Sequence, residues 1–346
     1  MRVGTFVFPG VDNPKRDGAV IQEALEEAEL AEALGMDAVW LAEHHFDGMC
    51  AYVDPIVFAA ALAERTHCVK LGFAVVQASL HHPLRLAEQL SLLDHLTKGR
   101  LIAGLGKGSM FNAYEYEAFE IQAEQAAERF DEIEEIILAC WRSEKVIHRG
   151  KYWNFEVPML RPRPFSRPHP PLLRATGSKG SVIKHAASGR PYLLAGPEQA
   201  VFGSTELIRT TMQAAGRRED DIASILGQSW VWQHVVVAPT DREAHEIGMK
   251  AVRDYIAYRD QLGLKSTLAD LMRAAIAKGG PPGGYVFGSP ATVTERLRAF
   301  ARAGLGGLII RFDIGPIPAS VSRASLKLFM SDVAPALRGA TLSAVG

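Results

Sequence analysis

The segment "DAVWLA", residues 37–42, decides how the rest of the chain is interpreted. After Asp37 it runs through apolar and small residues, without the polar alternation of a strand that has one face in water. Such a run is typical of a strand in a parallel sheet, which helices cover on both faces. Before it, from about residue 19, apolar side chains recur at helical spacing, and Gly35 suits the C-terminal cap of that helix. Another helix is expected near 54–66.

The same alternation of strand-like and helix-like patterns continues along the chain. The clearest helix begins at Pro83, which suits a first turn, and ends at Lys98, directly before Gly99. The strand-like runs are eight in number: 2–8, 37–42, 69–76, 100–106, 171–177, 191–196, 229–238 and 306–313. Regular βα alternation predicts parallel strands with right-handed crossovers, and eight repeats predict an α/β fold of the (β/α)8 TIM-barrel type. An open doubly wound sheet is the alternative.

Two segments interrupt this alternation. Residues 144–171 are rich in proline, and residues 263–289 end in "KGGPPGGYVFGSP". We expect both to be irregular insertions at the C-terminal face of a single barrel domain that spans residues 1–346. The glycines and prolines of 263–289 predict a mobile segment that could cover the barrel mouth as a lid.

Composition narrows the class of function. The 346 residues include 38 Lys and Arg against 39 Asp and Glu, so the formal net charge is −1, and no basic block predicts a nucleic-acid partner. Three widely spaced cysteines, Cys50, Cys68 and Cys140, favour free thiols in a reducing compartment. The sequence has neither a signal-peptide pattern nor a run of 18 uncharged apolar residues, and it therefore predicts a cytoplasmic protein without a membrane span.

In a barrel of this kind, the active site lies at the C-terminal ends of the strands. After the fifth strand-like run, Gly177, Ser178 and Ser181 occupy a turn before a helix, where backbone N–H groups and hydroxyls suit a phosphate. Ordinary N-capping by a serine is the alternative. Lys107, in "GLGKG" after the fourth run, adds a cation that could reach the same anion. Arg129 is a third candidate, although a salt bridge on a helix surface explains it equally well.

The segment "AEHHF" places Glu43, His44 and His45 after the second strand-like run, at the same edge. An imidazole titrates near neutral pH and suits general acid–base catalysis, and Glu43 could orient one ring or accept a proton. The alternative is that both rings only pack at the barrel rim. A metal site that adds His81 and His82 is disfavoured, because adjacent residues of an extended segment point to opposite sides.

The segments "GMDAVWLAEHHF" and "HHPLRLAEQLSLLDHLTKGRLIAGLGKG" resemble the bacterial luciferase-like flavin-dependent monooxygenases. The resemblance also includes "ERFDE", "PHPPLLRATGS" and "FGSPATVTERLRAFARAGLGGLIIRFD", so it spans nearly the whole chain. The ordered series of motifs is more specific than any one of them. The resemblance implies a (β/α)8 barrel that binds reduced FMN at its mouth.

The resemblance also implies roles for individual residues. His44 matches the family's catalytic histidine, and Glu43 lies beside it against the flavin. The Ala74–Val75 bond matches a non-prolyl cis peptide that packs on the isoalloxazine ring. Lys107 stands where luciferase has an arginine, so the charge is kept but the bidentate fork is not. The remaining matches are to phosphate contacts: Arg129, Gly177, Ser178 and Ser181.

The activity implied by the resemblance is that of a two-component FMN-dependent monooxygenase. Reduced FMN would react with O2 at its C4a carbon, and the hydroperoxide would oxygenate a small organic substrate such as an aldehyde or a ketone. Because no nicotinamide-binding fingerprint follows a strand, a separate NAD(P)H:flavin reductase would supply the reduced flavin. The resemblance further implies a homodimer. The alternatives are an F420-dependent hydride-transfer oxidoreductase of the same superfamily, a non-catalytic flavin-binding subunit and a metal-dependent barrel hydrolase.

Overall fold

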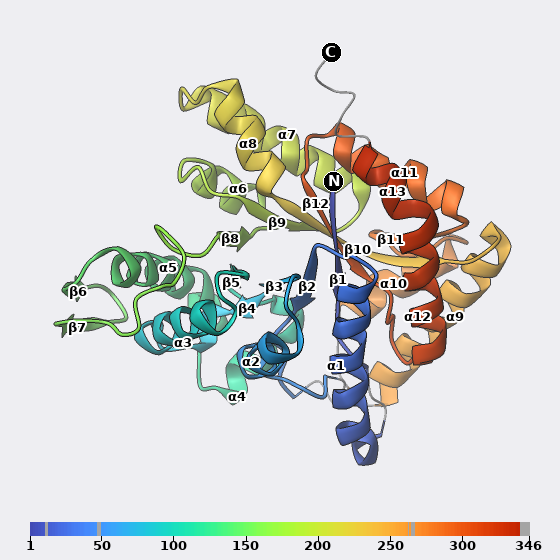
Figure 1. The fold of residues 1–346 in the computed structure, drawn as a ribbon, viewed down its shortest axis with the longest axis horizontal. Coiled ribbons are helices and arrows are strands. Elements are labelled where there is room, and N and C mark those ends of the chain that lie inside the picture. Colours follow the sequence, from blue (N-terminus) through green and yellow to red (C-terminus); the bar gives the residue numbers. More distant parts are fainter. Residues whose placement is uncertain (11–12, 47–49, 262, 264–266, 340–346) are drawn as a thin grey trace. The chain divides into compact units, whose positions relative to one another are not determined.

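The computed structural model describes residues 1–10, 13–46, 50–261, 263 and 267–339. Their contacts divide the chain into two compact units. The first unit contains residues 1–40, 50–51 and the described residues from 176 onward, and the second contains residues 41–46 and 52–175. Figure 1 labels the helices and strands, which are described below one unit at a time.

The first unit is built on a parallel sheet. Its strands are β1 (Arg2–Phe6), β2 (Ala38–Leu41, except its last residue), β9 (Tyr192–Ala195), β10 (Trp230–Val237), β11 (Tyr285–Gly288) and β12 (Gly307–Arg311). Neighbouring strands follow the order β9–β10–β12–β1–β2, and β11 pairs with the C-terminal half of β10. A doubly wound sheet would reverse its strand order at a switch point. Here the last strand, β12, instead lies beside the first, β1, as a ring of strands requires.

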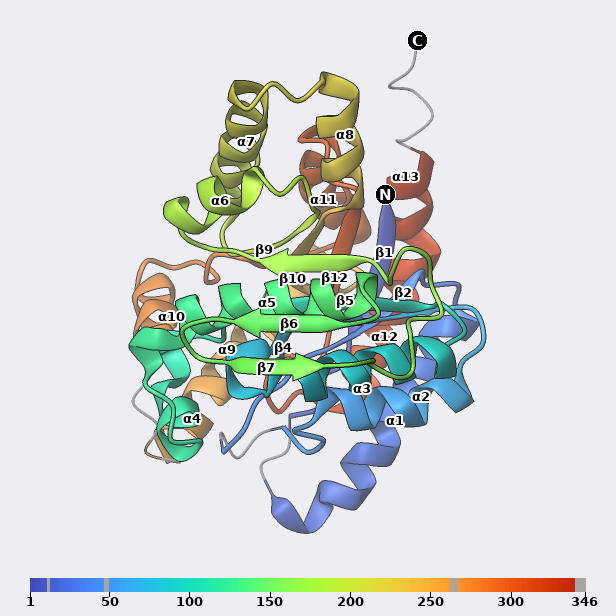
Figure 2. The same cartoon turned by 90° about the vertical axis from the view of Figure 1, so that its left-hand side faces the viewer.

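Helices follow the strands of the first unit. They are α1 (Asp17–Ala33), α6 (Lys179–Ala186), α7 (Glu198–Ala214), α8 (Glu219–Gln228), α9 (Asp241–Gln261), α10 (Thr267–Ala277), α11 (Pro290–Arg302), α12 (Ala319–Leu328) and α13 (Ala334–Gly339). Figure 2 shows α6, α7 and α8 grouped together. Local chemistry sets the helix ends: α1 ends before Gly35, whose φ is +80°, and the Ser289 hydroxyl caps α11 by accepting the Thr292 N–H.

The second unit repeats the alternation. Its parallel strands β3, β5 and β8 lie in that order, β4 pairs with β5, and β6 and β7 form an antiparallel hairpin. The strands are β3 (Lys70–Phe73), β4 (Val76–Gln77), β5 (Leu101–Gly106), β6 (Val146–Arg149), β7 (Asn154–Val157) and β8 (Leu172–Ala175). The helices are α2 (Pro55–Arg65), α3 (Pro83–Leu96), α4 (Ala113–Ala118) and α5 (Ala126–Arg142).

The predicted (β/α)8 barrel is confirmed. Each of the eight strand-like runs forms a parallel strand, and the β2 residues are all buried, as the apolar run 37–42 predicts. In the first unit, Trp40 from β2 and Trp230 from β10 pack edge to face with their ring centroids 4.9 Å apart. Both rings are fully buried, so the core of this unit lies against its strands. Across the described residues, no helix has the length and apolarity that a bilayer crossing needs.

The two interrupting segments contain more regular structure than the sequence predicts. Within 263–289, of which 264–266 lie outside the described residues, the chain forms α10 and β11. The glycines and prolines before Tyr285 concealed a short buried strand, whose aromatic and β-branched residues pair with β10 from His234 to Val237. In 144–171, β6 and β7 form the hairpin beside α5 (Figure 2). Residues 158–171 carry two cis prolyl bonds and no helix or strand.

Candidate active site

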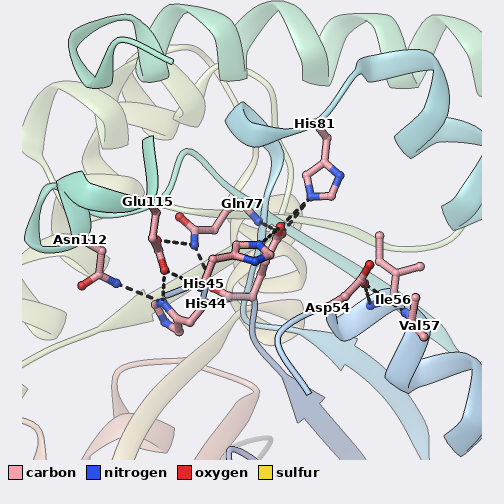
Figure 3. Close-up of polar contacts among 10 residues, drawn as sticks. His44, His45, Asp54, Ile56, Val57, Gln77, His81, Asn112 and Glu115 are labelled. Atoms are coloured by element: carbon pink, nitrogen blue, oxygen red, sulfur yellow. Dashed lines mark hydrogen bonds and ion pairs between the residues drawn. The ribbon is translucent and has the colours of Figure 1, made fainter. Parts of the chain in front are cut away.

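The chain after β2 places Glu43, His44 and His45 in the second unit. Figure 3 shows His44 and His45 near Gln77, which belongs to the segment that follows β3. The Glu43 N–H donates to the Val75 carbonyl at 3.0 Å, and the Ala74 N–H donates to the Leu41 carbonyl at 2.7 Å. The Ala74–Val75 peptide bond is cis, as the resemblance predicts. The predicted run 69–76 forms two short strands, β3 and β4, and this bond lies between them.

Glu43 is a buried anion. Its side chain accepts a hydrogen bond from the Gln77 N–H at 2.7 Å and lies 2.9 Å from Nε2 of both His45 and His81. Burial alone would raise the pKa of this carboxyl. The hydrogen bonds to His45 and His81, the charge of His81 and the Gln77 N–H outweigh burial and lower the pKa to about 2. Glu43 is therefore ionised at neutral pH and is only a weak base there.

His81 is the second imidazole that contacts Glu43. Burial would lower the pKa of its imidazole, but the hydrogen bond and the charge of Glu43 raise it above its usual value. The carboxylate of Asp54 raises it further. Asp54 also begins α2, where it accepts the N–H groups of Ile56 and Val57 at 2.9 and 3.1 Å (Figure 3).

His44 contacts a second carboxylate. Its Nδ1 lies 3.1 Å from Oε1 of Glu115 and 3.0 Å from Nδ2 of Asn112. The two histidines of "HH" thus approach different carboxylates, His44 approaching Glu115 and His45 approaching Glu43 (Figure 3). This agrees with the expectation that adjacent residues of an extended segment point to opposite sides.

Glu115 and Gln77 connect the cluster. Glu115 is completely buried and accepts the His45 N–H at 2.9 Å and the Gln77 side-chain amide at 2.7 Å. The same amide donates to the Glu43 carbonyl oxygen at 2.9 Å, so Gln77 joins both acidic residues. We name the set formed by Glu43, His44, His45, Gln77, His81, Asn112 and Glu115 the carboxylate–histidine cluster.

The predicted phosphate contacts of the second unit converge on Ser79. The Ser79 hydroxyl lies 2.9 Å from the carbonyl oxygens of Lys107 and Ala126, the latter at the start of α5. Arg129, one turn into α5, donates to the Ser79 carbonyl at 3.4 Å. Its guanidinium also lies over the ring of Trp153, at 4.8 Å from the centroid. The Lys107 backbone and the Arg129 guanidinium therefore both contact Ser79, and among the described residues Arg129 forms no salt bridge of the kind that was its alternative.

The remaining predicted residues, Gly177, Ser178 and Ser181, lie in the first unit at the start of α6. The Ser178 hydroxyl accepts the Ser181 N–H at 3.2 Å, which is the N-capping bond that the sequence left as an alternative. A side chain added at Gly177 would meet no atom within 4 Å. The serine therefore caps the start of α6, and the backbone at Gly177 is also open to a ligand.

Sequence reasoning did not identify Gln77, Asn112 and Glu115. Gln77 carried a signal, because it is the first polar residue after the third strand-like run. Asn112 and Glu115 carried none, because they lie at the N-cap and in the first turn of a short six-residue helix rather than directly at a strand end. His81 was considered only as a metal ligand. Among the described residues, no group of three or more His, Cys, Asp or Glu side chains is arranged to hold a metal ion.

Comparison with known proteins identifies the family. The sequence model of the luciferase-like monooxygenases matches residues 1–306. The oxygenase component of the flavin-dependent trigonelline monooxygenase of Acinetobacter baylyi is 26% identical over 100% of both chains. An F420-dependent glucose-6-phosphate dehydrogenase of Kineococcus radiotolerans is 30% identical over 56% of this chain and 58% of its own. The crystal structure of monooxygenase RslO1 from Streptomyces bottropensis is 28% identical, with a TM-score of 0.81 over 97% of this chain and 99% of that one.

The family model matches most of the chain, and the (β/α)8 barrel, the cis Ala74–Val75 bond and the carboxylate–histidine cluster agree with that match. The chain therefore belongs to the luciferase-like monooxygenase family of oxidoreductases.

Proposed function

We propose that this protein is a flavin-dependent monooxygenase that uses reduced FMN and O2 to oxygenate a small organic substrate, such as an aldehyde or a ketone. The observation that carries the proposal is the carboxylate–histidine cluster, in which buried Glu115 contacts the His44 ring and the Glu43 N–H donates to the Val75 carbonyl. A buried carboxylate behind a partly exposed imidazole is suited to general acid–base catalysis. Membership of the family supports the oxidoreductase class.

The residues present suit a flavin mononucleotide. The Arg129 guanidinium donates to the Ser79 carbonyl, and the exposed Lys107, whose backbone carbonyl accepts from the Ser79 hydroxyl, adds a second cation on the neighbouring loop. The capped turn at Gly177, Ser178 and Ser181 supplies N–H and hydroxyl donors. We assign these residues to the phosphate and the Ala74–Val75 backbone to the isoalloxazine ring. When bound, the reduced flavin supplies the activation of O2.

The protein's own residues have separate roles in this proposal. His44 transfers the proton that the oxygenation requires. Glu43 remains ionised and holds His45 and His81 in place, because its pKa of about 2 leaves it without a proton near neutral pH. We propose that the described part of the 263–289 segment covers the barrel mouth and excludes water, as the sequence predicts.

An F420-dependent hydride transfer is the second candidate, because one relative is named as an F420-dependent dehydrogenase. Anaerobic titration with reduced FMN and, separately, with reduced F420 distinguishes the two. Binding is followed by quenching of the five tryptophans, of which Trp153 lies over Arg129. We expect saturable quenching with reduced FMN, followed by O2 uptake in the presence of an aldehyde. Quenching by F420 alone would contradict the proposal, and FMN binding without O2 uptake would indicate a non-catalytic subunit.

We further propose that a separate NAD(P)H:flavin reductase supplies the reduced FMN, as the name "oxygenase component" of the trigonelline relative suggests. Purified protein with FMN and NADH should then consume no O2, and adding a flavin reductase should start consumption. Oxidation of NADH by the protein alone would contradict a two-component system. We also propose a homodimer and a single barrel domain, and light scattering coupled to gel filtration measures the former.

A further inference from the structure

We propose that Glu115 is a positioning residue, which holds the neutral His44 ring in the tautomer with the proton on Nδ1 and so makes Nε2 the atom that accepts the reaction's proton. This inference rests on the proposed function, which assigns proton transfer to His44. In a neutral imidazole, the hydrogen bond at one ring nitrogen decides which nitrogen carries the proton. A charged contact of this kind lies 3.1 Å from Nδ1 of His44, at Oε1 of Glu115.

The other contacts of Glu115 show that it acts as an acceptor. Its Oε1 accepts the His45 N–H at 2.9 Å, and its Oε2 accepts the Gln77 amide N–H at 2.7 Å. Both of these donors are N–H groups, and a carboxylate has acceptor sites for further donors on each oxygen. A proton on Nδ1 of His44 fits this arrangement. A bare Nδ1 would instead place a lone pair 3.1 Å from a buried carboxylate oxygen.

Asn112 competes for the same ring nitrogen. Its Nδ2 lies 3.0 Å from Nδ1, and an amide N–H in that place would require a bare Nδ1. A hydrogen bond to a charged acceptor is roughly twice as strong as one between neutral groups, so the Glu115 contact prevails. A half-turn of the Asn112 amide then presents its oxygen to the Nδ1 proton, since the two ends of an amide have nearly the same shape.

The position of Glu115 is itself fixed through Gln77. The Gln77 side-chain amide contacts both Glu115 and the Glu43 carbonyl, and its backbone N–H donates to the Glu43 carboxylate at 2.7 Å. Glu115 therefore cannot move away from His44 without breaking contacts with the rest of the cluster. A ring fixed in this way presents Nε2 in a constant orientation, which is what a proton acceptor needs.

The tautomer can be measured directly in the cofactor-free protein. Histidine labelled with 15N gives different chemical shifts for protonated and bare ring nitrogens, and His44→Asn identifies the His44 signals. Above the pH at which the ring becomes neutral, we expect the Nδ1–H tautomer in the unaltered protein. In Glu115→Gln, the amide that replaces the carboxylate can donate to the ring, as can the amide of Asn112, and we expect the proton to move to Nε2.

A matched control exists in the same unit. Nε2 of His148 lies 2.9 Å from Oε1 of Glu132, so Glu132→Gln removes an equivalent charge from another histidine. It should leave the His44 signals unchanged. If Glu115→Gln does not fold, Asn112→Leu tests the same point, because it removes the competitor and should keep the proton on Nδ1. A proton on Nε2 of His44 in the unaltered protein, or its loss from Nδ1 in Asn112→Leu, would overturn the proposal.

Turnover gives an independent readout. Glu115→Gln should lower kcat for coupled oxygenation by about 100-fold, within the range for acid–base groups, while the affinity for reduced FMN stays within about twofold. In a His44→Ala background, the same substitution should have little further effect, because the two residues act as a unit. A protein that has the Nδ1–H tautomer but fails to bind flavin would refute the proposed function and leave only the positioning of the His44 ring by Glu115 standing. An equal loss in both backgrounds would refute the inference.

Discussion

Glu43 is a buried side chain that carries a negative charge. The hydrogen bonds and charge of its neighbours offset the free-energy penalty of removing that charge from water. Its pKa of about 2 lies below the usual 4.5, so its ionisation stabilises the fold above pH 4.5, and this contribution is lost as pH falls through about 2. The raised pKa of His81 acts in the opposite direction. Its contribution is complete below the usual 6.5 and is lost as pH rises through the raised value. Both contributions are complete between pH 4.5 and 6.5.

Glu43→Gln should therefore lower the free energy of unfolding by roughly 3 kcal/mol near pH 5.5, which corresponds to the change in pKa. About half of that difference should remain at pH 3. Urea denaturation at the two pH values measures it. Glu117→Gln is the matched control, because this exposed residue of the same second unit loses the same charge. A Glu43→Gln effect that is small, or that is the same at both pH values, would show that Glu43 is not held as an anion.

Lys107, which the resemblance places where luciferase has an arginine, tests the phosphate assignment. Lys107→Ala should weaken the binding of reduced FMN roughly tenfold, because one charged contact is lost. Lys107→Arg should bind at least as tightly as the unaltered protein, since the guanidinium adds a bidentate fork. Anaerobic fluorescence titration compares the variants. If riboflavin, which has no phosphate, loses as much affinity as FMN, then Lys107 does not contact the phosphate.

At this scale the sequence predicted strand-end residues better than helix residues. Glu43 and His44 were recognised because a buried run ended directly before them, and the cis bond at Ala74–Val75 was recognised through the resemblance. Glu115 was not, because its role arises from tertiary contacts between α4 and the end of β2. Local spacing carries no information about a contact between residues 71 positions apart.

Among the elements, the loop between β5 and α4 is the one that determines the geometry of the cluster. Gly108 has a φ of +88°, and a methyl group there would overlap the Tyr116 hydroxyl and the Gln77 side-chain oxygen. Tyr116 in turn donates to the Lys107 carbonyl oxygen. The loop therefore needs glycine for its backbone conformation and also for the space that Gln77 occupies.

Gly108→Ala should lower the free energy of unfolding by roughly 2–4 kcal/mol, the sum of a left-handed conformation and an overpacked contact. Gly35→Ala isolates the first part, because its φ is +80° and no atom lies within 4 Å of the added carbon. That control should cost roughly 1 kcal/mol. Chemical denaturation compares the two. If both variants lose the same free energy of unfolding, then the Gln77 and Tyr116 side chains move aside for the added methyl group without destabilising the fold.

The elements also show where sequence patterns fail. The helices begin at Pro55 and Pro83 as expected, because capping and proline signals are local. β11 was not found, because four residues between glycine-rich turns are too short for a periodic signal. Its pairing with β10, which is a long-range interaction, is what makes it a strand.

For the whole molecule, cofactor binding should appear as stabilisation of the folded state. Reduced FMN at 100 times its Kd should add about 2.7 kcal/mol to the free energy of unfolding and raise Tm by several degrees. Anaerobic differential scanning fluorimetry measures the shift, with reduced F420 and riboflavin as controls. A shift with F420 and none with FMN would favour the hydride-transfer candidate.

The fold class was the most predictable property of the molecule. Eight βα alternations with continuous apolar strands suit few architectures, and the placement of β12 beside β1 excludes a switch-point sheet. The substrate was not predictable, because side chains from many separated loops line the mouth of such a barrel, and no sequence period relates them.

The pairing of Arg2 with Gly307 also has a consequence for how the chain acquires its structure. A ribosome that adds 5–20 residues per second needs roughly 15–60 s to reach the last strand after it has made the first. During that interval one edge of β1 has no partner, and an unpaired edge is a site of aggregation. The second unit, which is almost continuous in sequence, leaves the ribosome well before β12 does. We therefore expect the first unit of a nascent chain to need chaperones that prevent aggregation. If translation is slowed between the synthesis of β1 and that of β12, we expect these chaperones to prevent less of the aggregation.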